Sequence, residues 1–86
     1  MIWNQNVPSG CRLEMYIRST NTGPTPDYST STWQGPYTSA TSIGRQNLTG
    51  NSELQSKRYY QYRVDMYSCS LNTKLPTLYD VELEID

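Results

Sequence analysis

The sequence predicts an all-β protein, a small antiparallel β-sandwich of the jelly-roll-like or immunoglobulin-like type. Three segments alternate apolar and polar side chains with the period of two that is typical of half-buried strands. No segment of useful length has helical periodicity, and Gly, Pro and Ser turns separate the strand-like segments. The 86 residues suffice for one domain, residues 1–86, whose core is thin because so small a domain buries only about 60% of its surface.

The first alternating segment spans residues 11–18 and follows a turn at Pro8-Ser9-Gly10. Its apolar side chains share one face, and its charged side chains and Tyr16 share the other. The apolar set consists of Cys11, Leu13, Met15 and Ile17. We therefore expect a strand that covers the core on one side.

The second alternating segment, residues 58–69, is the longest and most aromatic of the three. Its enrichment in Tyr and Val favours a strand over a helix. The expected inward set consists of Tyr60, Tyr62, Val64 and Met66. We expect this segment to be the central strand and its inward face to be buried between the sheets.

The third alternating segment, residues 78–86, has a strongly acidic face. The apolar set is Tyr79, Val81, Leu83 and Ile85, and the acidic set is Asp80, Glu82, Glu84 and Asp86. Like charges two residues apart repel unless a basic neighbour lies across the sheet. Arg12, Arg18 and Arg63 occupy the polar faces of the other two segments. We therefore expect the three strands to pair, with basic and acidic side chains meeting on the solvated face.

Residues 19–42 form a long Ser/Thr-rich loop region, with twelve Ser or Thr in 24 positions. Such a composition is typical of disorder, but Trp33 and Tyr37 bracket Gly35-Pro36, and aromatic side chains in a polar loop normally fold back onto the protein. We expect one short strand near residues 31–34 or 36–40. A second is expected near residues 42–48, where Ile43 and Leu48 supply the apolar anchors.

Composition argues against enzymatic function and against a metal or other cofactor. The chain has no His, so His-based acid–base chemistry, nucleophile activation and His-ligated metal sites are excluded. Two Cys are too few for a four-cysteine zinc site. The carboxylates Asp65, Asp80, Glu82 and Glu84 are candidates for a glycosidase pair or a calcium site, but exposed strand faces provide no cleft, and a solvated charge ladder is favoured.

The remaining composition bears on partners. A net charge of -1 gives no general attraction to nucleic acid, and the basic residues Lys57, Arg58 and Arg63 are split between two strand faces. No apolar run approaches the roughly 20 residues of a membrane span, so we expect no span in this chain.

Cys11 and Cys69 are predicted to form a disulfide. It would close a loop of about 57 residues, which stabilises a fold by roughly 3–4 kcal/mol in the chain-entropy model. Cys11 lies on the apolar face of its segment, whereas Cys69 has the polar parity of its own. A bulge or the end of a strand would reconcile the two; the alternative is two unpaired small residues.

Candidate binding residues are mostly aromatic. Trp33, Tyr37, Tyr59 and Tyr67, together with Tyr16, are candidates for a platform on which sugar rings stack; alternatively, Trp33 caps the core and the Tyr rings shield the sheet. Asn47-Leu48-Thr49 matches the N-glycosylation pattern.

Near the N-terminus, Ile2 and Trp3 are apolar residues that a small domain does not leave exposed. They either cover their own sheet or dock on a neighbouring molecule, and we list both as candidate interface residues.

The segments quoted above resemble a known module. Pro8-Ser9-Gly10, Trp33-Gln34-Gly35-Pro36-Tyr37, Arg58-Tyr59-Tyr60-Gln61-Tyr62-Arg63-Val64 and Pro76-Thr77-Leu78 occur in this order. They are similar to a β-sandwich module of bacterial and archaeal cell-surface proteins, prepilin-type proteins and phage appendages, over residues 7–86.

The resemblance implies an extracellular or cell-surface location and a structural subunit of a pilus-like filament. It implies association with copies of the chain or with a companion fibre subunit. The alternatives are a carbohydrate-binding module that uses Trp33 and Tyr37, and a phage or virion decoration protein.

Overall fold

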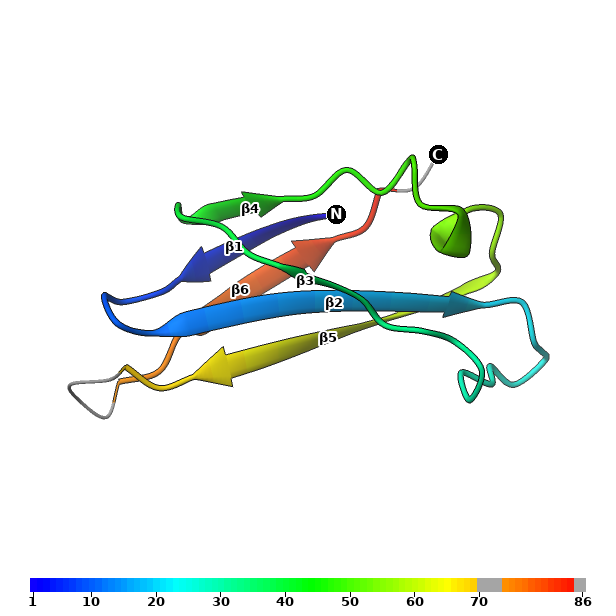
Figure 1. Cartoon of the computed structure of the whole chain (residues 1–86), viewed down its shortest axis with the longest axis horizontal. Helices are drawn as coiled ribbons and strands as arrows, with labels where there is room; N and C mark the ends of the chain where they lie inside the picture. The colour runs from blue at the N-terminus through cyan, green and yellow to red at the C-terminus, as the bar shows by residue number, and fades with distance from the viewer. Residues whose placement is uncertain (70–73, 85–86) are drawn as a thin grey trace.

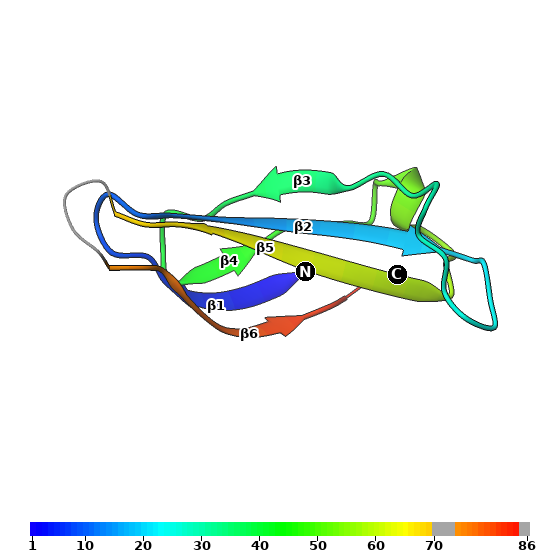
Figure 2. The ribbon, with the colours of Figure 1, turned by 90° about the horizontal axis from the view of Figure 1, so that it is seen from below.

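The computed structural model describes residues 1–69 and 74–84, which form two three-stranded antiparallel sheets packed as a sandwich (Figures 1 and 2). One sheet has the strand order β4-β1-β6 and the other β3-β2-β5. The elements are β1 (Ile2–Asn6), β2 (Arg12–Thr20), β3 (Gln34–Tyr37), β4 (Ile43–Arg45), the 3-10 helix η1 (Ser52–Leu54), β5 (Tyr59–Tyr67) and β6 (Thr77–Glu82). The predicted fold class is confirmed.

The core lies between the sheets and follows the predicted alternation of β2. Leu13, Met15 and Ile17 are all buried, while the residues between them face outward. From the opposite sheet β1 contributes Trp3, and the segments around η1 contribute Leu48 and Leu54. The apolar face of β2 thus forms one side of the core, as its period of two predicted.

β2, rather than β5, is the central strand of its sheet, so the prediction for residues 58–69 is wrong in this respect. β5 pairs with β2 along its whole length and with no other strand among the described residues. As a result, Tyr62 and Met66 are 51% and 40% exposed although they have the inward parity. Tyr60 and Val64 are half-buried and pack against the core. The alternation was correct, but an edge strand is covered on its inner face only in part.

β6 pairs with β1 in the other sheet, which corrects the predicted pairing of the third segment with the first two. A register shift places Leu78 opposite Gln5 and Asp80 opposite Asn4, so Tyr79 is an extra residue in the strand. The bulge changes the inward set: Leu78 and Val81 pack against the core, whereas Tyr79 is 66% exposed. The predicted positions Ile85 and Asp86 lie outside the described residues.

The ion pairs also differ from the prediction. Arg12 pairs with Glu14 at 3.6 Å and Arg63 with Asp65 at 3.1 Å, and each pair lies within one strand. The carboxylates of β6 belong to the other sheet, so they do not meet these arginines across a pair of strands.

β1 is a strand that the sequence analysis did not predict, and it is the centre of its sheet. Trp3 is fully buried, so it covers its own sheet, which is one of the two alternatives that the sequence left open. Its neighbour Gln5 is also buried, accepting a hydrogen bond from Trp3 Nε1 at 2.8 Å. β1 has only five residues, and its inward side chains are one aromatic ring and one amide. Such a segment is too short and too polar to be recognised by hydrophobic periodicity.

β3, residues 34–37, bridges the two ranges expected for the first short strand, 31–34 and 36–40, and matches neither alone, whereas β4 lies within the expected residues 42–48. Leu48 is a buried anchor as predicted, but Ile43 is exposed on the outer face of β4. The cysteines form the predicted Cys11–Cys69 disulfide. Because Cys69 lies beyond the end of β5, strand parity does not constrain it.

Candidate functional site

The outer face of the β3-β2-β5 sheet carries interleaved arginine and aromatic side chains, which we call the cation–π row. The register of β2 and β5 creates it, because Arg12 lies opposite Tyr67 and Tyr16 lies opposite Arg63. The connection between β2 and β3 adds two further rings. The members of the row are Arg12, Tyr16, Arg18, Tyr28, Trp33, Arg63 and Tyr67.

The stacking distances in the row run from 3.9 to 5.0 Å between the guanidinium carbon and the ring centroid. Arg63 lies 4.1 Å from the ring of Tyr16 and 4.9 Å from that of Trp33. It therefore contacts both its neighbouring strand β2 and the segment that connects β2 to β3. Arg18 lies 4.3 Å from Trp33, and its Nε donates to Gln61 at 2.7 Å. Each exposed contact of this kind stabilises by about 0.5–1 kcal/mol, so the row orders the outer face.

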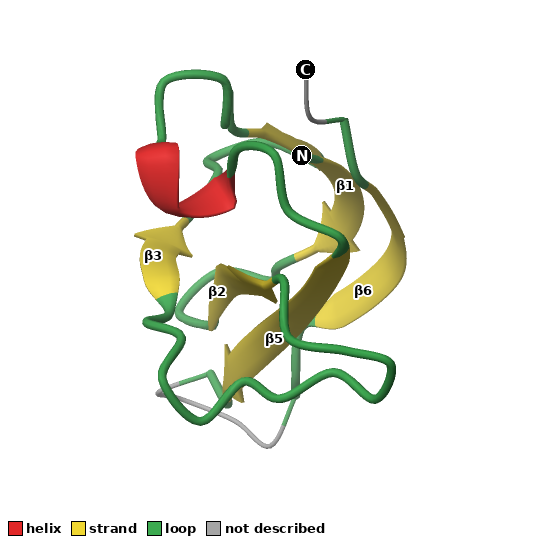
Figure 3. Ribbon diagram, turned by 90° about the vertical axis from the view of Figure 1, so that its right-hand side faces the viewer, coloured by secondary structure: helices red, strands yellow, loops and turns green. Residues whose placement is uncertain are grey.

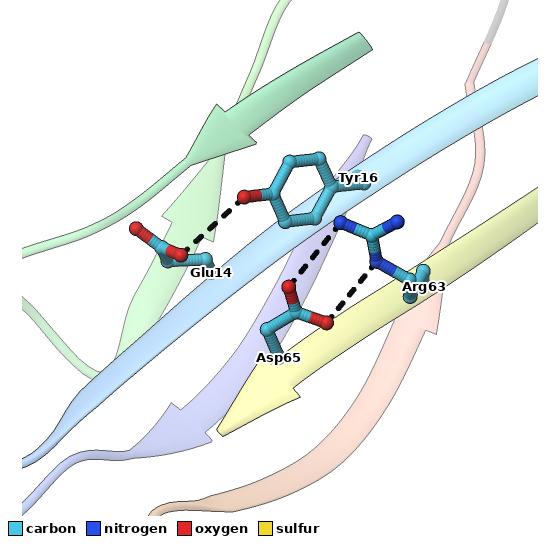
Figure 4. Close-up of polar contacts among 4 residues, drawn as sticks. All are labelled: Glu14, Tyr16, Arg63 and Asp65. Atoms are coloured by element: carbon cyan, nitrogen blue, oxygen red, sulfur yellow. Dashed lines mark hydrogen bonds and ion pairs between the residues drawn. The ribbon is translucent and has the colours of Figure 1, made fainter. Parts of the chain in front are cut away.

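Two carboxylates complete the row at its centre (Figure 4). Asp65 accepts from Nε and Nη2 of Arg63 at 3.1 and 3.2 Å, and Glu14 accepts from the hydroxyl of Tyr16 at 3.4 Å. Burial of the Tyr16 hydroxyl raises its pKa, and the charges of Glu14 and Asp65 raise the same pKa further. The phenol is therefore a neutral donor at physiological pH.

The four predicted ligand-binding aromatics do not form one platform. Tyr37 is opposite Met15, whose side chain is buried, and it packs against the core, whereas Trp33 lies against the guanidinium groups of the cation–π row. Tyr59 and Tyr67 are at opposite ends of β5, eight residues or roughly 27 Å apart at about 3.4 Å per residue. The two arginines that contact Trp33 were not predicted; the available signal was that both have outward parity on strands whose outward residues include Tyr16, Tyr59 and Tyr67.

The side of the sandwich formed by β5 and β6 has a different character. Both strands are the last in their sheets, and the end-on view of Figure 3 draws β6 next to β5. Among the described residues, six of the seven exposed large apolar side chains lie on these strands or close to the ends of β6. They are Tyr62, Met66, Tyr67, Leu75, Tyr79 and Leu83; the seventh is Ile43. We call this region the β5/β6 side.

Among the hollows of the described surface, one borders the β5/β6 side at Leu83 and another lies near the disulfide. One, of about 580 Å³, is lined by Ile2, Asn47 and Leu83 among others, and Arg45 and Glu84 are its charged side chains. The other, of about 330 Å³, lies beside Gln5 and Cys11 and has no acidic or basic side chain in its lining. Ile2 is half-buried at the first hollow. Neither hollow brings two carboxylates together.

Asn47 is exposed, as a glycan acceptor must be. Its Oδ1 accepts from the backbone N–H of Thr49 at 2.9 Å, which folds the tripeptide into a local turn.

Within the described ranges, no group of three or more His, Cys, Asp or Glu side chains is arranged to hold a metal ion. The same residues include no helix with the length and hydropathy of a membrane span.

Comparison with family models, with curated proteins and with solved structures finds no match to this chain.

Proposed function

We propose that the chain is a non-enzymatic structural subunit of an extracellular surface assembly, such as a pilus-like filament, and that it associates with copies of itself through the β5/β6 side. The observation that carries this proposal is the concentration of six of the seven exposed large apolar side chains, among the described residues, beside two unpaired strand edges. Exposed apolar patches mark interaction sites, and unpaired edges are templates for further strands.

The energetics favour association at this side. Apolar surface contributes about 25 cal/mol per Å² when it is removed from water, and an edge strand adds backbone hydrogen bonds to that contribution. In a monomer, Tyr62, Met66 and Tyr79 leave much of their surface in water. A neighbouring subunit that packs on this side would bury that apolar surface and form hydrogen bonds with the backbone of the edge strand.

The disulfide supports an oxidising compartment. Bridges such as Cys11–Cys69 persist in oxidising environments and are rare in the cytosol. This supports an extracellular or cell-surface location for the assembly. A companion fibre subunit is a second possible neighbour for the same side.

The carbohydrate-binding alternative receives less support from the geometry. A sugar platform needs exposed ring faces that lie together, whereas Tyr37 packs against the core and two guanidinium groups lie over Trp33. Catalysis likewise lacks a hollow with two converging carboxylates among the described residues.

Analytical ultracentrifugation tests the proposal. The native chain is expected to self-associate, and Tyr62→Ser is expected to weaken association about tenfold. Ile43→Ser is the matched control, because Ile43 is 53% exposed but lies on β4, and it should leave the association unchanged. A native chain that stays monomeric at roughly 1 mM, where a contact of about −4 kcal/mol is substantially formed, would overturn self-assembly.

A further inference from the structure

The four edge strands differ in how well they are protected against pairing. β3 has four residues and contains Pro36, and β4 has only three residues. β6 carries Asp80 and Glu82, so two copies of β6 would bring like charges together. Short length, proline and charge are the usual devices that protect edges.

β5 has none of these devices. It has nine residues, without Pro or Gly, and its charged residues are one Arg and one Asp, whose charges cancel. Its side away from β2 pairs with no strand in the described part of the chain. β5 is therefore the edge best suited to accept another strand.

We propose that β5 pairs antiparallel with β5 of a second copy across a twofold axis at Val64. The two β3-β2-β5 sheets then form one continuous six-stranded sheet. This inference rests on the proposed self-association and specifies its geometry. It commits to a second copy as the partner because the sequence of β5 is complementary to itself.

On the inner face, the axis at Val64 places Tyr62 opposite Met66 of the second copy. The same pair recurs across the axis, and Val64 lies opposite its own symmetry mate. Tyr62 and Met66 are the inward-parity residues of β5 that a single copy leaves exposed. Aromatic–apolar cross-strand pairs of this kind each contribute favourably to a sheet.

On the outer face, the same axis places Arg63 opposite Asp65 of the second copy. Within one copy these side chains already form a two-point contact at 3.1 and 3.2 Å. In the dimer, Arg63 and Asp65 each gain a second partner of opposite sign, and for Asp65 this partner offsets Glu14, which lies opposite it on β2. Charge complementarity and apolar complementarity thus select the same register.

Neighbouring registers lose one or both kinds of complementarity. An axis at Arg63 places Arg63 opposite its own copy, and an axis at Asp65 does the same for the carboxylates. An axis at Tyr62 leaves Arg63 opposite Gln61 and Asp65 opposite Tyr59. Shifts by an odd number of positions place the inner face of one copy beside the outer face of the other.

Charge exchange tests the register by ultracentrifugation. Arg63→Asp and Asp65→Arg each place like charges opposite one another and are expected to weaken the homodimer about tenfold. An equimolar mixture of the two variants should recover the native affinity, since the heterodimer restores both opposite pairs. The double variant R63D/D65R should recover it in a homodimer. Arg45→Asp, on β4, is the matched charge control and should leave the dimer unchanged.

Cysteine cross-linking tests the register without disturbing the cation–π row. Val64→Cys lies opposite itself, so mild oxidation should give a covalent dimer that reductant separates. Tyr62→Cys faces Met66 instead and should give far less cross-linking. Circular dichroism and thermal unfolding establish that each variant is folded.

The two proposals fail in different ways. Native protein that is monomeric throughout the concentration range overturns self-association and the register together. Native protein that associates, while the charge mixture shows no recovery and folded Val64→Cys gives no covalent dimer, overturns the β5 register and leaves self-association standing.

Discussion

The two sheets of this sandwich are built by different means. The β3-β2-β5 sheet has two nine-residue strands, an inner face of regularly spaced apolar residues and an outer face ordered by the cation–π row. The β4-β1-β6 sheet is centred on a five-residue strand whose inward side chains are Trp3 and Gln5. The first sheet distributes its stability over many residues, whereas the second concentrates it on a few.

Gln5 shows how the short sheet accommodates a buried polar group. Its amide accepts from Trp3 Nε1 at 2.8 Å and donates to the carbonyls of Ser39 and Thr41 at 3.1 and 2.7 Å. Each buried side-chain N or O among the described residues has a hydrogen-bond partner. The amide therefore ties the strand to the loop before β4 and costs little to bury.

Truncation of the buried side chain at the centre of each sheet, Trp3 or Met15, should give the largest losses of unfolding free energy and test the difference between the sheets. Trp3→Ala is expected to cost about 3–5 kcal/mol, because Trp3 is the one large inward side chain of β1 and its loss also leaves Gln5 without a donor. Met15→Ala should fall near the lower end of about 2–5 kcal/mol, since Leu13 and Ile17 flank the cavity. Urea unfolding measures both, and a larger loss for Met15→Ala would contradict the contrast between the sheets.

The disulfide closes one end of the long-stranded sheet, and its removal should have a similarly large effect. The bridge spans 58 positions, which corresponds to about 4 kcal/mol in the chain-entropy model. We expect a loss of about this size in the unfolding free energy of the double variant C11S/C69S. Intact mass is the control: a native chain that gains no hydrogen on reduction has no bridge to remove.

Gly44 tests how tightly the short sheet is packed around Trp3. A Cβ at Gly44 would collide with the indole of Trp3, so Gly44→Ala is expected to cost about 1–3 kcal/mol or more. Gly50→Ala is the matched control, because nothing lies near its Cβ position, and it should change stability little. Equal thermal shifts in the two variants would show that the Trp3 site can relax.

Removal of one guanidinium should have a smaller effect on the long-stranded sheet. Arg18→Met keeps much of the aliphatic stem but loses two ring contacts, and a cost of about 1 kcal/mol is expected. Arg45→Met serves as the control, since Arg45 is an exposed arginine outside the row. Chemical unfolding followed by tryptophan fluorescence measures the loss, and an equal effect of both substitutions would argue against the stacking contribution.

The smallest expected effect is a pH dependence from Tyr16. Its raised pKa means that the folded chain holds the phenolic proton more tightly than the unfolded chain. The corresponding stabilisation is complete below about pH 10 and is lost as the pH rises through the higher folded value. Tyr16→Phe should therefore lose less stability between about pH 8 and pH 11 than the native chain does. Equal losses of stability in Tyr16→Phe and the native chain would contradict a raised pKa for Tyr16.

Several features of the fold could be predicted from local pattern. The inward positions Leu13, Met15 and Ile17 of β2, the position of β4 within residues 42–48 and the Cys11–Cys69 bridge are confirmed, and β3 lies between the two ranges expected for it. Of the candidate site, the sequence indicated outward aromatic residues but not their arginine partners. Those partners lie on a neighbouring strand or across a long connection, so register and loop path decide the contacts.

The sequence by itself determined that the chain is all-β, because alternation with a period of two depends only on the directions of successive side chains. The tertiary structure decided which strand lies at the centre of each sheet, since pairing partners are chosen by contacts between residues far apart in the chain. It placed β5 at an edge, which exposes Tyr62 and Met66, and it buried Trp3 with Gln5 inside a strand too short to have a recognisable period.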